Sequence, residues 1–140
     1  MTQSPDQIYS QPLEAITGFV FDQNVVKVFR DMIGRSVPGY ATLISMLPVL
    51  AQKYAQDHTR CYDLGCSLGA ATLALRHSIS HNNVTLIAVD NSAAMMAQCK
   101  HYIDQDTARL PVEFHCADIC QLEITNASLV IMNFTLQFIP

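Results

Sequence analysis

One short segment limits what this chain can fold into more than any other. It runs from Cys61 to Thr72 and consists of an apolar stretch that ends on an acid, two glycines separated by three residues, and a run of helix formers. This order predicts a β-strand, a tight loop and the N-terminus of a helix. Gly65 can adopt backbone angles that residues with a Cβ avoid, and Gly69 allows a ligand or neighbouring backbone to approach closely. The loop can therefore present backbone N–H groups to a small molecule held against it.

The glycine spacing narrows the choice of ligand. A phosphate-binding P-loop ends in Gly-Lys-Ser/Thr, and this loop contains no lysine. The dinucleotide pattern G-x-G-x-x-G is also absent, because Cys66 and Ser67 follow Gly65 directly. The form that remains, D-x-G-x-x-x-G with Asp63 at the strand end, is typical of proteins that bind S-adenosylmethionine, whose sulfonium cation gains from a nearby carboxylate. A strand-to-helix turn that needs glycines only for packing is the alternative.

Composition excludes several classes of function. A chain of 140 residues with 50% hydrophobic and 14% charged residues predicts one domain, residues 1–140. The net charge of -4 and the scattered Lys and Arg argue against direct binding of nucleic acid. Five cysteines without regular spacing predict reduced thiols, and the pair Cys116 and Cys120 lacks the further ligands of a metal site. We expect a cytoplasmic protein with no membrane span, because no apolar run is long enough to cross a bilayer.

The first 57 residues are predicted to form a helical N-terminal cap. Residues 1–23 are predicted to form an arm that lies over the rest of the chain. Its anchoring residues would be Ile16, Phe19, Val20 and Phe21. A helix with Asn24 as its N-cap is expected to end before Gly34. A second helix is expected over residues 40–56, with a bend or restart at Pro48.

Strands and helices alternate after residue 60. One helix is predicted from Ala70 to about residue 80. A second helix, with Ser92 as its N-cap, is predicted to continue to about residue 106. Strands are predicted at residues 84–90, 111–116 and 127–133. This alternation predicts an α/β fold, a Rossmann-like, doubly wound and mostly parallel sheet. Ligands bind such sheets outside the carboxyl ends of the strands, where Gly65, Asp90, Asp118 and Asn133 would gather.

Those strand ends suggest how a nucleoside would be held. Asp90 can accept hydrogen bonds from both ribose hydroxyls, and we expect it to contribute to affinity rather than to stability. Asn91 would lie at the adenine edge, Asp118 near the exocyclic amine, and Ile119 would offer a backbone N–H and an apolar face to the base. The alternative for a strand-end aspartate is that it only caps the next helix, as Asp90 could through the turn at Ser92.

Four blocks carry a family resemblance: residues 30–40, 62–73, 89–92 and 132–138. They resemble the carboxy-S-adenosyl-L-methionine synthases of the class I S-adenosylmethionine-dependent methyltransferase-like superfamily. The pieces Ser-Val-Pro-Gly-Tyr and Asp-Leu-Gly-Cys-Ser-Leu-Gly-Ala-Ala distinguish this family from ordinary class I methyltransferases, in which glycine commonly stands at the position of Ser67. The chain is similar to the N-terminal part of the family.

The resemblance implies a reaction in which S-adenosyl-L-methionine and prephenate give carboxy-S-adenosyl-L-methionine and phenylpyruvate. A partner enzyme would then use the product to carboxymethylate the wobble uridine of tRNA. It further implies a homodimer in which an arginine of the neighbouring subunit holds the product carboxylate. The catalytic base is not identified, and hydroxide or a substrate carboxylate is expected. Contacts to the cofactor are implied for Tyr40, Gly65, Cys66, Ser67, Asp90, Asn91, Asp118, Ile119 and Asn133.

Two other functions stay open, an ordinary methyltransferase and a fragment that only binds S-adenosylmethionine. A dehydrogenase would need the dinucleotide glycines. Family members continue well beyond Pro140, so we expect this chain on its own to lack synthase activity. The strand at residues 127–133 is then expected at the sheet edge, where its uncharged apolar sequence would lower solubility or pair with another chain.

Overall fold

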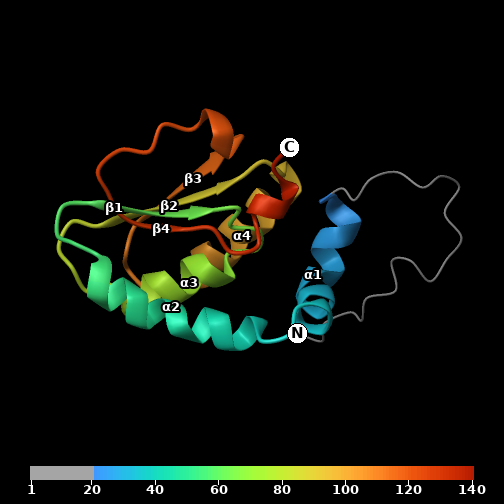
Figure 1. Ribbon diagram of the computed structural model, residues 1–140, viewed down its shortest axis with the longest axis horizontal. Helices are drawn as coiled ribbons and strands as arrows, with labels where there is room; N and C mark the ends of the chain where they lie inside the picture. The colour runs from blue at the N-terminus through green and yellow to red at the C-terminus, as the bar shows by residue number, and fades with distance from the viewer. Residues whose placement is uncertain (1–20) are drawn as a thin grey trace, which may run out of the picture.

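The computed structural model describes residues 21–140, so the predicted anchors Ile16, Phe19 and Val20 lie outside the described residues. Two helices come first, and strands and helices then alternate (Figure 1). The elements are α1 (Gln23–Ser36), α2 (Tyr40–Tyr54), β1 (Arg60–Leu64), α3 (Ala70–Ser78), β2 (Thr85–Asp90), α4 (Ala93–Gln105), β3 (Val112–Cys116), η1 (Ile119–Gln121), β4 (Ala127–Ile131) and η2 (Leu136–Phe138).

The four strands form one parallel sheet in the order β3-β2-β1-β4. Asp63 of β1 lies opposite Ala88 of β2 on one side and Ile131 of β4 on the other. The chain moves outward from β1 to β3 and then returns to the far side of β1, as in the first part of a doubly wound sheet. The predicted Rossmann-like α/β fold is confirmed, and its switch point lies between β1 and β4.

Helices cover one face of the sheet (Figure 1). Leu47 of α2 and Leu75 of α3 pack with Leu86 of β2, while Cys99 of α4 packs with Ala88. Leu86 and Ala88 are two residues apart on one strand and therefore point to the same face. The opposite face buries Tyr62, Leu64, Ile87 and Val89 beneath Ala117, Ile119 and Leu122, which belong to the connection between β3 and β4.

The ends of α1 differ from the prediction. Asp22 and not Asn24 is the N-cap, because its carboxylate accepts hydrogen bonds from the backbone N–H groups of Asn24 and Val25 at 2.9 and 3.1 Å. The helix also continues through Gly34, and the backbone N–H of Val37 donates to the Ile33 carbonyl at 3.0 Å. A Cβ at Gly34 would meet nothing within 4 Å, so close packing does not require a glycine at this position of the helix.

Of the two alternatives predicted at Pro48, a bend or a restart, the restart is wrong, because α2 is one helix across this residue. Proline removes one backbone donor, but Leu47 and Ala51 on either side of it are buried in the core and stabilise the helix. The N-cap prediction for α4 is confirmed, since Ser92 Oγ accepts a hydrogen bond from the Met95 backbone N–H at 3.2 Å.

Candidate functional site

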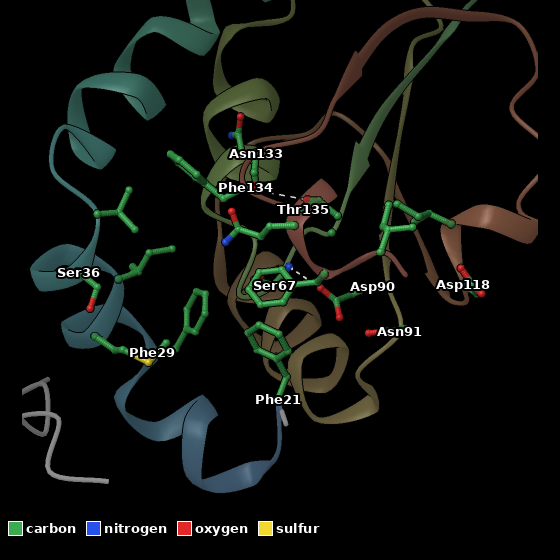
Figure 2. Close-up of a pocket in the computed structure, with 18 of the residues that line it drawn as sticks. Phe21, Phe29, Ser36, Ser67, Asp90, Asn91, Asp118, Asn133, Phe134 and Thr135 are labelled. Carbon is green, nitrogen blue, oxygen red and sulfur yellow. Dashed lines mark hydrogen bonds between the residues drawn. The ribbon is translucent and has the colours of Figure 1, made fainter. Parts of the chain in front are cut away.

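A cavity of about 520 Å³ lies at the carboxyl ends of the four strands. Every strand end contributes to its wall: Gly65 and Ser67 after β1, Asp90 and Asn91 at β2, Ala117 to Ile119 after β3, and Asn133 to Thr135 after β4. Helix α1 supplies the facing wall, and Figure 2 shows its residues Phe29 and Ser36 across the cavity from Asp118. The cavity therefore occupies the position at which doubly wound sheets bind their ligands.

The loop after β1 requires its first glycine. Gly65 has φ +79°, and a Cβ there would lie 2.6 Å from the methyl carbon of Thr135. The hydroxyl of Thr135 donates to the Leu64 carbonyl at 2.8 Å. Thr135 thus fastens the segment after β4 against the end of β1, and only a residue without a side chain leaves room for it.

The next residues of this loop are held by the end of β2. Ser67 has φ +50°, a left-handed conformation that favours glycine. Its backbone N–H donates to Asp90 Oδ2 at 2.9 Å, and the backbone N–H of Ser92 donates to Asp90 Oδ1 at 2.9 Å. Asp90 lines the cavity and is also a structural acceptor for two backbone groups, so we now expect it to contribute to stability as well as to affinity. Each carboxylate oxygen retains acceptor capacity for a ligand.

Asp63 does not face the cavity. The residue is 3% exposed, and its carboxylate accepts a hydrogen bond from Thr72 Oγ1 at 2.6 Å. Burial raises the pKa of this carboxyl to about 6, against the lowering effect of Thr72, and the charge of Asp90 raises it further. The expectation of a carboxylate beside a sulfonium is therefore not met by Asp63, because its side chain points under the loop toward α3.

The connection after β3 forms another part of the wall. Asp118 is the N-cap of η1, and its Oδ1 accepts from the Cys120 backbone N–H at 2.9 Å. Asp118 therefore caps a helix and also lines the cavity. Ile119 packs on the buried face of the sheet and lines the cavity beside Asp118. Asn91 lines the same side and precedes the cap of α4.

The segment after β4 contains a backbone outlier and an unpaired amide. Phe134 has φ +52°, which is rare for a bulky residue and is typical of functional or strained positions. Asn133 lines the cavity, and its Nδ2 is buried without a hydrogen-bond partner among the described residues. Sequence reasoning placed Asn133 at this edge but gave no signal for the conformation of Phe134.

The aromatic part of the wall was missed. Phe21 lies 6.2 Å from Phe29 and 5.1 Å from Phe138 between ring centroids, and all three line the cavity. The hydroxyl of Ser92 donates to the Phe21 carbonyl at 2.6 Å and so holds the start of α1 against the start of α4. The helical spacing of Phe29 and Met32 was the available signal, but it indicates an apolar face without showing that this face covers a ligand site.

Two of the nine predicted contact residues are absent from the wall of the cavity. The ring centroids of Tyr40 and Phe134 lie 6.2 Å apart, and burial, followed by the charge of Asp63, raises the pKa of the Tyr40 phenol. The side chain of Cys66 is buried toward α4, with its Sγ 3.6 Å from the Met96 sulfur. Its backbone N–H already donates to the Val89 carbonyl. Cofactor contacts by these two residues stay a prediction.

The charge of the wall is negative. Asp90 and Asp118 are the only ionisable side chains among the described residues that line the cavity. This arrangement favours a ligand with hydrogen-bond donors or a positive charge. Among residues 21–140, no group of three or more His, Cys, Asp or Glu side chains could hold a metal ion, and no helix is long and apolar enough to cross a membrane.

The comparison with known families identifies the domain. A sequence profile described as a methyltransferase domain matches residues 61–140, which is more than half of the chain. The chain belongs to the methyltransferase domain family. The match begins at β1 and includes every strand of the sheet, so this methyltransferase domain carries the four strand ends that form the cavity.

Curated relatives confirm the finer resemblance. The chain is 52% identical over 141 residues to the carboxy-S-adenosyl-L-methionine synthase of Geobacter sp. (strain M21), a match that covers 100% of this chain and 58% of the relative. It is 54% identical over 122 residues to the protein of the same name from Marinobacter nauticus, covering 87% of this chain and 49% of the relative. The chain therefore spans only about half to three fifths of the length of these relatives.

A solved structure supports the fold assignment. A protein from Methanococcus maripaludis, described as an S-adenosyl-L-methionine-dependent methyltransferase, superimposes with a TM-score of 0.69 at 18% identity. The match covers 90% of this chain and 56% of that protein. At this identity the likeness shows the fold alone, and the fold is that of the class I methyltransferases.

Proposed function

We propose that this chain binds S-adenosyl-L-methionine, or its carboxylated form, as part of a carboxy-S-adenosyl-L-methionine synthase. The observation that carries this proposal is the cavity itself. It lies at the switch point of a methyltransferase sheet, two aspartates are the only ionisable side chains that residues 21–140 contribute to its wall, and the relatives with about 50% identity are named for this reaction.

The wall is suited to a nucleoside with a sulfonium. Asp90 ends β2 with free acceptor capacity for ribose hydroxyls, and Asp118 lies at the end of β3 for the amine of adenine. Ile119 offers an apolar surface to the base. The unpaired Nδ2 of Asn133 is a donor that an oxygen or nitrogen of the bound molecule would satisfy. Neither Asp90 nor Asp118 favours a pyrophosphate, because both would repel its charge.

The second substrate in this proposal is prephenate, with phenylpyruvate as the second product. Prephenate is a dianion, whereas the described wall contains no Lys, Arg or His. A cation must therefore come from outside this wall. The family resemblance points to an arginine of the neighbouring subunit, and so we propose a homodimer for the complete enzyme. The aromatic residues Phe21, Phe29 and Phe138 offer an apolar surface for a six-membered ring.

The remaining proposals follow from the same assignment. We propose a single domain over residues 1–140 with residues 1–57 as its helical cap, a cytoplasmic location, and no direct contact with nucleic acid or membrane. The product would be consumed by a tRNA carboxymethyltransferase that modifies wobble uridine.

The test is a product assay with S-adenosyl-L-methionine and prephenate. A full-length relative, such as the Geobacter protein, serves as the positive control beside this chain. We expect the full-length relative to release a cofactor heavier by one carbon dioxide together with phenylpyruvate, both measured by mass spectrometry. We expect this chain to bind the cofactor in calorimetry without turnover. A methylated acceptor in place of a carboxylated cofactor would instead assign an ordinary methyltransferase.

A further inference from the structure

Two exposed cysteines flank one part of the cavity wall. Cys116 ends β3 and Cys120 lies in η1, and both are free and exposed. The three residues between them all line the cavity: Ala117, Asp118 and Ile119. The other cysteines of the chain are buried: Cys61, Cys66 and Cys99. The exposed thiols therefore stand at the two ends of a segment that shapes the ligand site.

Each exposed cysteine also contacts a residue of the wall. The sulfur of Cys116 lies 3.9 Å from the carbonyl oxygen of Asn91. The backbone N–H of Cys120 donates to Asp118 Oδ1 at 2.9 Å. Desolvation, followed by the charge of Asp118 and a hydrogen bond to its carboxylate, raises the pKa of the Cys120 thiol. Asn91 and Asp118 line the same cavity, so a change at either sulfur is transmitted directly to its wall (Figure 2).

A covalent bond between the two sulfurs is incompatible with these contacts. Disulfide formation removes the S–H group of Cys120, and with it the donor to Asp118. It also requires the two Cα atoms to lie within about 7 Å of each other with their Cβ atoms pointing together. In this structure the Cys116 sulfur contacts Asn91, whereas the Cys120 side chain contacts Asp118. The bond would therefore draw η1 away from its Asp118 cap.

We propose that Cys116 and Cys120 form a modification site: a small-molecule disulfide oxidises this dithiol reversibly to an intramolecular disulfide, and the new bond displaces Asp118 from the cavity wall. Formation of the bond does not depend on what the cavity binds. Its effect on S-adenosylmethionine rests on the proposed function, in which Asp118 holds the amine of adenine. Exposed disulfides are among those that thiols reduce readily, which suits a switch rather than a structural crosslink.

The reaction is a thiol–disulfide exchange in two steps. The raised pKa of Cys120 lowers its thiolate fraction, so we expect Cys116 to attack first. The Cys116 thiolate forms a mixed disulfide with one sulfur of the small disulfide and releases the other as a thiolate. The Cys120 thiolate then attacks the Cys116 sulfur, closes the protein disulfide and releases the second small thiolate. The released thiolates take up the two protons that the protein thiols lose. The protein is oxidised by two electrons, and the small disulfide is reduced to two thiols.

The buried cysteines should not take part. A hydrogen bond with Cys99, together with burial, raises the pKa of the Cys66 thiol, and burial raises the pKa of Cys61. Protonated thiols are poor nucleophiles, and a small disulfide cannot reach a buried sulfur in the folded chain. Oxidation is therefore expected at the exposed pair.

Oxidised glutathione is the probe for the first test. The folded chain is incubated with it, the free thiols are alkylated, and the intact chain and its peptides are analysed by mass spectrometry. We expect the wild-type chain to lose two hydrogen atoms, with Cys116 and Cys120 joined in one peptide, and dithiothreitol should restore both thiols. Cys120→Ser should stop at the mixed disulfide and retain one glutathione on Cys116. Two free thiols in the treated wild-type chain, or a separate glutathione on each, would overturn the proposal.

Two further measurements test the displacement of Asp118. Hydrogen exchange at the Cys120 backbone N–H should become at least about tenfold faster after oxidation, because this group loses its acceptor. In calorimetry, the oxidised chain should bind S-adenosyl-L-methionine at least about tenfold more weakly than the reduced chain. Cys116→Ser cannot form the bond and should keep the affinity of the reduced wild type after the same treatment.

Unchanged hydrogen exchange at Cys120 in the disulfide form would overturn the proposal. An equal affinity for S-adenosyl-L-methionine in the two redox states would also overturn it. Absence of binding by the reduced chain would instead contradict the proposed function, and hydrogen exchange would then decide by itself whether the disulfide breaks the Asp118 cap.

Discussion

The buried carboxyl of Asp63 should make the stability of this chain depend on pH in a direction unusual for an aspartate. Burial raises its pKa to about 6 from an ordinary value of 3.8. A raised pKa in the folded state means that protonation favours folding, so this contribution is fully present below about pH 3.8 and is lost as the pH rises through about 6. A pKa difference of about 2, at about 1.4 kcal/mol per pH unit, amounts to about 3 kcal/mol.

Asp63→Asn should remove this dependence, because the amide oxygen can still accept the hydrogen bond from Thr72 Oγ1 and does not titrate. Between pH 4 and pH 7, the free energy of unfolding in urea should fall by about 2.5 kcal/mol less for the variant than for the wild type. Asp104→Asn, which removes one exposed charge on α4, corrects for the change in net charge. Parallel pH profiles for Asp63→Asn and wild type would refute the argument that Asp63 ionises in a buried site.

Three further substitutions test the loops around the cavity. Asp90→Ala should lower the free energy of unfolding by about 2 kcal/mol, because the Ser67 N–H loses its acceptor, and should weaken S-adenosylmethionine binding more than about tenfold in calorimetry. A loss of stability with an unchanged Kd would make Asp90 a structural residue only. Gly65→Ala should cost at least about 2 kcal/mol in urea unfolding, since its Cβ would collide with Thr135, and a neutral effect would contradict the geometry of this loop. Thr135→Val should lower stability by about 1 kcal/mol through the lost bond to the Leu64 carbonyl, whereas Thr135→Ser keeps the hydroxyl, so equal melting temperatures for the two variants would argue against that bond.

The part of the fold that follows residue 60 could be predicted because its signals are local. Each strand is a short apolar run that ends at a polar residue or glycine, and each intervening helix begins at a recognisable residue such as Gly69 or Ser92. Parallel strands bring their carboxyl ends to one edge, so Asp90, Asp118 and Asn133 could be placed together from the sequence alone. The structure brings all three to the cavity.

The remaining features depend on contacts between distant segments. Asp90 also accepts a hydrogen bond from the loop after β1, and the donor, the backbone N–H of Ser67, is 23 residues away in the sequence. The inward turn of Asp63 is set by Thr72 of α3, although a strand-end acid could equally face outward. The sequence pattern around Phe29 indicates an ordinary core residue of an amphipathic helix. Phe29 is part of the cavity wall only because α1 lies over the strand ends. The placement of α1 over the strand ends is a tertiary contact, and no short stretch of sequence predicts it.

In the function proposed here, the cavity at the strand ends binds S-adenosylmethionine. The most direct measurement is a calorimetric titration of the folded chain with S-adenosyl-L-methionine and, separately, with NAD, repeated on Asp90→Ala. We predict saturable binding of S-adenosyl-L-methionine at one site and loss of this signal in the variant. We predict at least about tenfold weaker binding of NAD, because Asp90 and Asp118 repel its pyrophosphate. Tighter binding of NAD than of S-adenosyl-L-methionine by the folded chain would contradict it.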